Sequence, residues 1–221
     1  MASVDRDEAA ARLAEVHERI ARAAALAGRS AREITLIAVT KTFGADAILP
    51  LLEAGHRAFG ENRVQEAAAK WPPLIERYPD IELHLIGQLQ SNKAAEAARL
   101  FASIHSLDRP SLLSALARAE MRRPVFVQVN IGAEAQKGGC PIAETGALVA
   151  DAQAAGLEVR GLMCVPPAAV EPAPYFALLA KMRGELGLPA LSMGMSSDFE
   201  TAVMLGATHV RVGSALFGSR V

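Results

Sequence analysis

A lysine follows a run of apolar, mostly β-branched residues in the stretch 36–42, which reads LIAVTKT. Such a run is typical of a buried strand. An amine at the end of a buried strand is desolvated on one side, which makes the neutral and nucleophilic form of Lys41 accessible for Schiff-base chemistry. A lysine that simply reaches solvent at a strand end is the commoner case. The assignment therefore depends on what else lies near Lys41.

Two turns rich in glycine and hydroxyl groups lie near the end of the chain. The stretch 192–200 (SMGMSSDFE) places Ser196 and Ser197 just before an expected helix, where free backbone N–H groups favour an anion. Ser197 and Glu200 also fit the spacing of a capping box, and this role is compatible with anion binding by the neighbouring N–H groups.

The second turn, in the stretch 210–214 (VRVGS), adds Arg211, Gly213 and Ser214. These supply a cation, a position where the backbone can approach a ligand closely, and a further hydroxyl group. The two turns together are typical of a phosphate site.

Strands and helices alternate along the chain with little linker between them, a pattern that predicts a parallel sheet. Strands are expected at residues 34–40, 57–60, 82–86, 102–106, 124–130, 159–163, 190–193 and 209–212. Helices are expected at residues 5–27, 45–54, 62–71, 92–100, 110–121, 142–155, 174–186 and 198–205. Eight strands favour closure into a single (β/α)8 TIM-like barrel, one domain spanning residues 1–221, over an open doubly wound sheet.

Only residues 213–218 follow the eighth strand, so the last barrel helix is missing from the pattern. We expect the extra helix at residues 5–27 to cover that part of the sheet.

The carboxyl ends of the strands form the usual active-site face of such a barrel, and the two turns above follow strands seven and eight, the usual phosphate site. Strand eight would lie beside strand one, which brings the phosphate site close to Lys41. A Schiff-base lysine beside a phosphate cradle is what pyridoxal 5′-phosphate requires.

Other polar side chains fall on or after the expected strands, and each has an ordinary structural explanation. Asparagines there can cap a helix or turn, and the histidines can be hydrogen-bonded core residues. These side chains are those of Glu61, Asn62, His84, His105, Ser106, Asn130 and Cys164.

Several motifs resemble the pyridoxal phosphate homeostasis protein family, which is similar to the N-terminal barrel domain of alanine racemase. They are AVTK (38–41), FGEN (59–62), HLIGQLQSNK (84–93), RGLM (160–163), SMGMSSDF (192–199) and RVGSALFG (211–218). The resemblance implies that Lys41 carries the cofactor as a Schiff base. It also implies that Ser196, Arg211, Gly213 and Ser214 surround the phosphate, and that Asn62 and Met163 line the ring.

The chain departs from the family at a few positions. Phe43-Gly44 stand where many relatives have a second lysine and a proline, and Arg63 stands where a tyrosine is frequent. The loop 165–174 looks short, and Ser214 replaces a threonine. The first departure leaves fewer amines near the mouth to act as a cofactor relay.

Three functions fit these residues. The resemblance implies a carrier in intracellular vitamin B6 homeostasis without established turnover. An amino-acid racemase is the alternative, although it needs acid–base groups on both faces of its substrate, and the chain's two tyrosines, Tyr78 and Tyr175, fall away from the expected strand ends. A lysine-dependent aldolase would need no cofactor.

Composition narrows the range of partners. The net charge of −1, with basic and acidic residues interspersed, gives no reason to expect a nucleic-acid or membrane surface. The N-terminal residues lack a signal-peptide order, and Cys140 and Cys164 lack zinc or disulfide spacing. We expect a cytoplasmic monomer with free thiols and a small-molecule cofactor. The enzymes that would receive the cofactor stay undefined.

Overall fold

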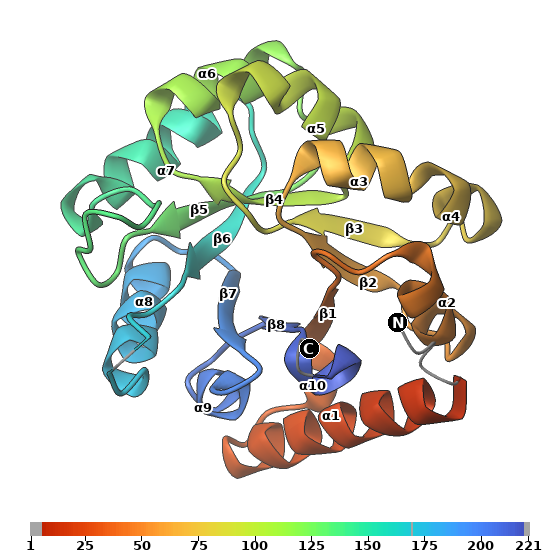
Figure 1. The fold of residues 1–221 in the computed structure, drawn as a ribbon. Coiled ribbons are helices and arrows are strands. Elements are labelled where there is room, and N and C mark those ends of the chain that lie inside the picture. Colours follow the sequence, from red (N-terminus) through yellow and green to blue (C-terminus); the bar gives the residue numbers. More distant parts are fainter. Residues whose placement is uncertain (1–5, 169, 219–221) are drawn as a thin grey trace.

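Eight parallel strands close into a barrel in the order in which they occur along the chain, with β8 beside β1 (Figure 1). The computed structural model describes residues 6–168 and 170–218. The strands are β1 (Thr35–Val39), β2 (Ala58–Glu61), β3 (Glu82–Leu85), β4 (Ser103–Leu107), β5 (Val125–Val129), β6 (Val159–Cys164), β7 (Ala190–Met195) and β8 (His209–Val212). The closed order confirms the predicted barrel and excludes the open sheet.

Helices surround the barrel as an outer ring (Figure 1). They are α2 (Ala45–Glu53), α3 (Val64–Lys70), α4 (Pro72–Arg77), α5 (Ala94–Leu100), α6 (Pro110–Arg118), α7 (Thr145–Ala154), α8 (Ala173–Glu185), α9 (Phe199–Met204) and α10 (Ser214–Phe217). Short 3-10 turns occur at Ala31–Glu33, Ser91–Lys93 and Ile142–Glu144. Within the described ranges, no helix combines the length and the apolar character needed to cross a bilayer.

The N-terminal helix α1 (Arg6–Leu26) covers the part of the barrel that lacks a full eighth helix, as predicted. It packs against α2, α9 and the single turn of α10 (Figure 1). Its buried stripe includes Leu13, Val16 and Ile20, which recur at helical spacing. Arg19 also donates two hydrogen bonds to the Glu200 carboxylate of α9, at 3.1 and 2.9 Å.

Two apolar layers make up the core. The larger lies between the sheet and the helices, and a small inner cluster of Phe126, Met163 and Ala190 fills part of the barrel itself. The two layers follow from alternation along each strand, since successive side chains point to opposite faces. In β8, for example, His209 and Arg211 share one face and Val210 and Val212 the other.

The structure corrects three local predictions. The helix expected at 62–71 begins at Val64, because Arg63 is still extended, and it breaks at Trp71 before the two prolines that open α4. The segment 213–218, expected to be irregular, contains the helical turn α10. The capping box is absent: Asp198 is the N-cap residue of α9, and Glu200 pairs with Arg19 instead of reaching back to the turn.

Candidate functional site

A cavity of about 790 Å³ opens at the carboxyl ends of the strands. This volume suits a small ligand or cofactor. Its walls come from the segments that follow β1, β2, β3, β6, β7 and β8. The lining residues are Val39, Lys41, Phe43, Asn62, Ile86, Val165, Met195, Ser196, Ser197, Arg211, Gly213, Ser214 and Gly218. Six of the seven residues predicted for the site are therefore together in one cavity.

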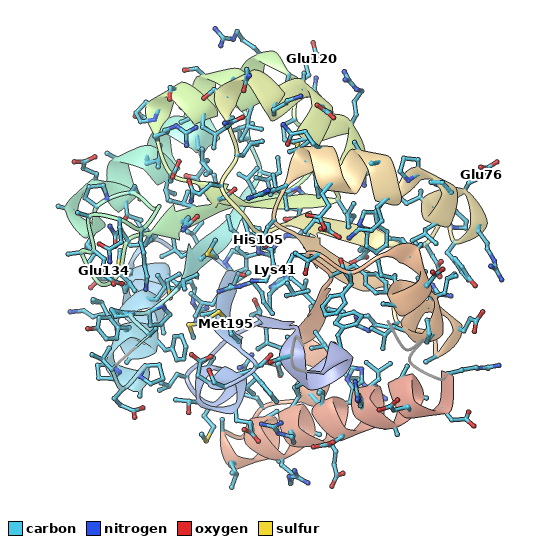
Figure 2. All side chains as sticks on the ribbon, viewed as in Figure 1. Lys41, Glu76, His105, Glu120, Glu134 and Met195 are labelled. Atoms are coloured by element: carbon cyan, nitrogen blue, oxygen red, sulfur yellow. The ribbon has the colours of Figure 1, made fainter. Side chains whose placement is uncertain are left out.

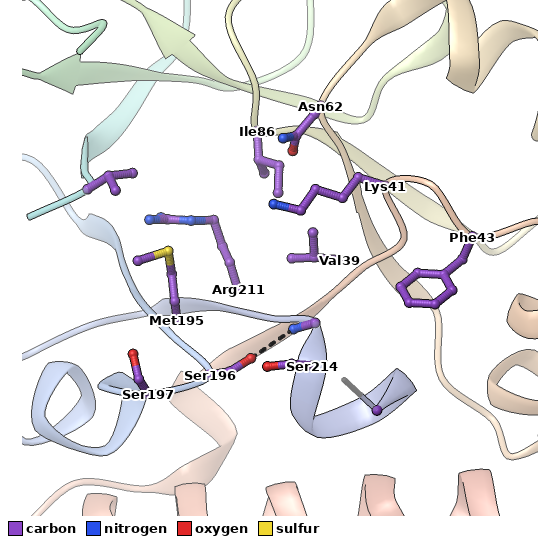
Figure 3. A pocket seen from close by; sticks show the side chains of 13 residues that line it. Val39, Lys41, Phe43, Asn62, Ile86, Met195, Ser196, Ser197, Arg211 and Ser214 are labelled. Atoms are coloured by element: carbon purple, nitrogen blue, oxygen red, sulfur yellow. Dashed lines mark hydrogen bonds between the residues drawn. The ribbon is translucent and has the colours of Figure 1, made fainter. Parts of the chain in front are cut away.

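Lys41 is partly buried and directs its amine into this cavity, toward the space between Ile86 and Arg211 (Figure 3). It lies two residues beyond Val39, the last residue of β1, in the turn that follows the strand, and both side chains line the cavity. Within the described residues the amine has no carboxylate at ion-pair distance and no hydrogen-bond acceptor. A lysine without a partner in an enclosed cavity is free to react with a carbonyl group that enters it.

Arg211 is a buried cation at the base of the cavity, with 5% of its surface exposed. Its guanidinium donates to Ser192 Oγ at 2.7 Å and to the Cys164 carbonyl at 2.8 Å. Burial lowers its pKa, although the distant Asp198 carboxylate opposes this effect. No Asp or Glu in the described part of the chain pairs with it, and an unpaired buried charge is costly. The cavity therefore favours an anionic ligand.

The hydroxyl-bearing turns after β7 and β8 lie side by side. Ser196 Oγ accepts a hydrogen bond from the Gly213 N–H at 3.1 Å, which ties the two turns together (Figure 3). In the residues that the structure describes, the N–H groups of Ser196, Ser197 and Ser214 donate to no protein acceptor. Unsatisfied N–H groups beside hydroxyl groups form a cradle for phosphate oxygens.

The turn after β7 requires glycine at position 194. Gly194 has a φ of +93°, and a Cβ there would lie 2.6 Å from the Cβ of Ala202 in α9. The absence of a side chain thus allows α9 to pack against the turn that carries Ser196.

Asn62 lies on the opposite wall, directly after β2, near the Lys41 amine (Figure 3). Gly87 lets the end of β3 approach it closely, since a Cβ at this position would lie 2.2 Å from the Asn62 carbonyl oxygen. This contact fixes the backbone of Asn62 at the rim.

Met163 is the predicted ring-lining residue that the structure does not place in the cavity wall. It is 1% exposed and belongs to the inner cluster with Phe126 and Ala190. In the sheet it pairs with Ser192, which in turn pairs with His209, two residues before Arg211. Met163 therefore lies one layer of side chains below Arg211.

Several apolar lining residues were not identified from the sequence. Val39 and Ile86 could have been found from alternation, since each lies two residues from a predicted inward side chain. Met195 is the last residue of β7, beyond a register irregularity that breaks its alternation with Ser192, and Val165 directly follows β6. Phe43 stacks on Phe217 of α10, with ring centroids 4.6 Å apart, a contact between segments far apart in the sequence.

Interior polar groups below the cavity have ordinary structural roles. His84 and His105 are hydrogen-bonded to each other at 3.1 Å, and His105 Nδ1 lies 2.8 Å from Ser192 Oγ. Burial lowers the pKa of His84 to about 3, and burial together with the neighbouring His84 lowers that of His105. Figure 2 shows His105 near Lys41 at the centre of the ring of helices, whereas Glu76 and Glu120 lie outside it.

The remaining candidates are also accounted for by local structure. Asn130 holds its own loop by bonding both the N–H and the carbonyl of Glu134. Cys140 and Cys164 are free and buried, and burial raises the pKa of Cys164 to about 12. Neither thiol therefore has the properties of a reactive cysteine.

The chain resembles known proteins over nearly its whole length. The family described as "Alanine racemase, N-terminal domain" matches residues 12–221. The pyridoxal phosphate homeostasis protein of Pseudomonas aeruginosa is 42% identical over 221 residues, which cover 94% of each chain. The protein of the same name from Escherichia coli (strain K12) is 39% identical and covers 94% of this chain and 95% of its own.

Solved structures show the same architecture. PipY of Synechococcus elongatus PCC7942, solved with PLP bound, has a TM-score of 0.79 and 38% identity, covering 90% of this chain and all of its own. An alanine racemase from Corynebacterium glutamicum has a TM-score of 0.70 at 19% identity, covering 99% of this chain but 63% of its own. The second likeness concerns the fold alone.

Proposed function

Because this chain belongs to the pyridoxal phosphate homeostasis protein family, we propose that it binds pyridoxal 5′-phosphate as a Schiff base on Lys41. The observation that carries the proposal is the shared cavity, in which an unpaired amine faces an unpaired buried guanidinium and a cradle of free N–H groups. The cofactor supplies an aldehyde for the amine and an anion for the cradle.

The residues of the cavity have different parts in this proposal. Ser196, Gly213 and Ser214 would hold the phosphate, while Arg211 supplies the positive charge of the site. Asn62 would lie along the ring, and Met163 would support it from below. A fixed guanidinium in the cavity disfavours protonation of a nearby ring nitrogen, which leaves the ring a weak electron sink.

We propose a carrier of the cofactor rather than an amino-acid racemase. Among the described lining residues there is no Asp, Glu, His, Cys or Tyr, so Lys41 is the one candidate acid–base group in the cavity. Tyr78 ends α4 and Tyr175 lies in the first turn of α8, and neither lines the cavity. Racemisation needs a second acid–base group on the opposite face.

The proposal extends to a monomer that works in the cytoplasm and passes the cofactor to enzymes that need it. The interspersed basic and acidic residues support it, as does the resemblance, because the family is similar to the N-terminal barrel domain of alanine racemase alone. Light scattering on the protein as it elutes from a size-exclusion column should give the mass of one chain. The mass of a stable dimer would contradict the monomeric state.

The decisive experiment is the visible absorption spectrum of purified protein, reconstituted with pyridoxal 5′-phosphate and then treated with borohydride. We expect a visible band that borohydride removes, with the cofactor mass fixed on the peptide containing Lys41. Lys41→Ala should lose both signals, whereas Lys181→Ala, an exposed lysine of α8, should keep them. A protein that stays colourless after reconstitution would refute the proposal and leave the cofactor-free aldolase function open.

A second experiment separates the carrier from the racemase. The loaded protein is incubated with L-alanine in D2O, and exchange at the α-carbon is followed by NMR. We expect no exchange above that of free cofactor; exchange accompanied by D-alanine would establish the racemase.

A further inference from the structure

Lys41 occupies a strained turn that its own residues do not favour. The Phe43 N–H donates to the Thr40 carbonyl at 3.1 Å, which closes a turn with Lys41 and Thr42 at its centre. Thr42 has a φ of +68°, in the left-handed region that a β-branched residue rarely adopts. Contacts from outside the turn must therefore keep it in this shape.

One face of α3 supplies these contacts. The Lys70 ammonium donates to the carbonyl of Thr40 at 3.0 Å and to that of Phe43 at 2.8 Å. Glu66 accepts a hydrogen bond from the Thr42 N–H at 2.7 Å. Lys70 and Glu66 are four residues apart, so they lie on the same face of the helix. They bind the backbone on both sides of Lys41.

A buried carboxylate holds Lys70 in place. Glu61 is fully buried, and its Oε1 atom lies 2.6 Å from Lys70 Nζ. The same oxygen accepts from Thr40 Oγ1 at 2.6 Å and from Trp71 Nε1 at 2.9 Å. An ammonium has three donors, and those of Lys70 go to the carbonyls of Thr40 and Phe43 and to the Glu66 carboxylate at 3.4 Å, while Glu61 supplies the ion pair. The lysine is thus fixed at the back of the turn.

We propose that Lys70 and Glu66 are positioning residues for Lys41. Neither lines the cavity, and both act by holding the turn that aims the amine. The inference deepens the proposed function and rests on it for the first test below, which measures the rate of reaction with the cofactor. The second test measures hydrogen exchange of backbone amides and is independent of any cofactor.

The first test uses the double variant Glu61→Gln/Lys70→Met, because Lys70→Met alone would leave Glu61 as an uncompensated buried charge. We expect the borohydride-trapped adduct on Lys41 to form roughly 10- to 100-fold more slowly, since misplacement of a reacting group has effects of this size. Lys181→Met, which removes an exposed lysine paired four residues away with Glu185, is the matched control and should keep the wild-type rate. A double variant within twofold of wild type would overturn the proposal.

The second test requires no cofactor. Hydrogen exchange of the Thr42 and Phe43 amides should become at least tenfold faster in the double variant, while the amides of β5 and β6 keep their protection. If the wild-type protein takes up no pyridoxal phosphate but these two amides lose protection in the double variant, the proposed function fails and the positioning role of Lys70 and Glu66 stands. Unchanged exchange at both amides in the double variant would overturn the positioning role of Lys70 and Glu66.

Two substitutions distinguish positioning from a general structural role. Glycine adopts a φ of +68° without strain, so adding Thr42→Gly to the double variant should restore most of the lost rate. Glu66→Gln keeps a carbonyl acceptor for the Thr42 N–H and should react faster than Glu66→Ala. A slow triple variant, or equal rates for the two Glu66 variants, would contradict the proposal.

Discussion

The two ends of the barrel differ in how their charges are satisfied. The amino end has the larger cavity, about 900 Å³ against about 790 Å³ at the mouth. Its charged groups include Arg160 and Asp80, which pair with Glu158 and Arg57 at 2.8 and 2.7 Å. At the mouth, Arg211 has no such partner among the described residues. Arg99 and Arg123 at the amino end also lack an ion-pair partner among the described residues, but they are exposed, whereas Arg211 is buried. A buried charge without a carboxylate partner therefore identifies the site better than the size of the cavity does.

The side chains with strongly shifted pKa values also differ in position from Lys41. The pKa of His84 is lowered to about 3 and that of His209 to about 4, with burial as the main cause for both. Both histidines lie below the mouth, and His84 is held by His105. Perturbed pKa values often indicate functional sites, but here the main cause is burial between the two cavities, with smaller contributions from neighbouring cationic groups. Here Lys41 and the two histidines occupy different layers of the barrel.

The largest predicted effect concerns this interior. Because the unfolded chain binds protons on His84 and His209 near pH 6.5 and the folded chain does not, stability should be lost as the pH falls below 6.5 toward about 4. Each histidine contributes at most about 1.4 kcal/mol per pH unit. Urea unfolding of apo protein at pH 7, 6 and 5 measures the slope, and His84→Gln should make it shallower. Equal stability at the three pH values would show that the folded chain takes up protons on these histidines as readily as the unfolded chain does, and would contradict the prediction.

The next effect concerns the mouth. Arg211→Met removes the buried cation, and the affinity for pyridoxal 5′-phosphate should fall by about 1.5–3 kcal/mol, the range for hydrogen bonds and contacts to a charged group. The free energy of unfolding of the apo protein should stay the same or rise, since the unpaired charge is gone. Equilibrium titration and urea unfolding measure the two quantities. Arg160→Met, at the other end, should alter neither, and a large loss of apo stability in Arg211→Met would assign Arg211 a structural role.

A smaller effect is expected where the hydroxyl-bearing turns after β7 and β8 meet. Ser196→Ala removes the acceptor of the Gly213 N–H and one hydroxyl of the cradle. The apo protein should lose about 1 kcal/mol or less of stability, whereas cofactor affinity should fall by a larger factor, since the cradle loses a donor as well as its alignment. Comparison of unfolding and binding data for the same variant tests this. Equal losses in both would indicate that Ser196 only joins the turns.

Much of this site could be predicted because alternation along a strand determines which side chains point inward. Lys41 and Arg211 were found more simply, as charged residues at or next to the carboxyl ends of expected strands, and alternation agrees with Val39 and Arg211 pointing into the cavity. Depth along the barrel axis is a different quantity, set by the register between neighbouring strands. The β6–β7 and β7–β8 pairings place Met163 beside Ser192 and Ser192 beside His209, and the β7–β8 register then shifts before Arg211. Spacing within one strand carries no information on such shifts.

Contacts between segments that are distant in the sequence could not be predicted from the hydrophobic and motif patterns either. The Phe43–Phe217 stack joins the turn after β1 to α10, and the Lys70 contacts join α3 to the same turn. The stack depends on closure of the barrel, which brings the first and last units together, and the Lys70 contacts depend on the packing of α3 against the preceding unit. Local motifs were equally misleading where tertiary contacts competed, as with Glu200, which pairs with Arg19 of α1.

The smallest predicted effect tests whether Glu200 pairs with Arg19 instead of completing a capping box with Ser197. Ser197→Ala should change the free energy of unfolding by less than about 0.5 kcal/mol, because its hydroxyl caps nothing and a surface change away from such features is nearly neutral. Asp198→Ala should cost about 0.5–2 kcal/mol, the range for losing a side-chain acceptor at a helix start, because its carboxylate accepts from the Met195 N–H at 2.5 Å. Urea unfolding of both variants under identical conditions compares them directly. If Ser197→Ala proved the more costly, the capping box expected from the sequence would exist in solution, and the free N–H groups of this turn would then be engaged by the protein instead of being available to a phosphate.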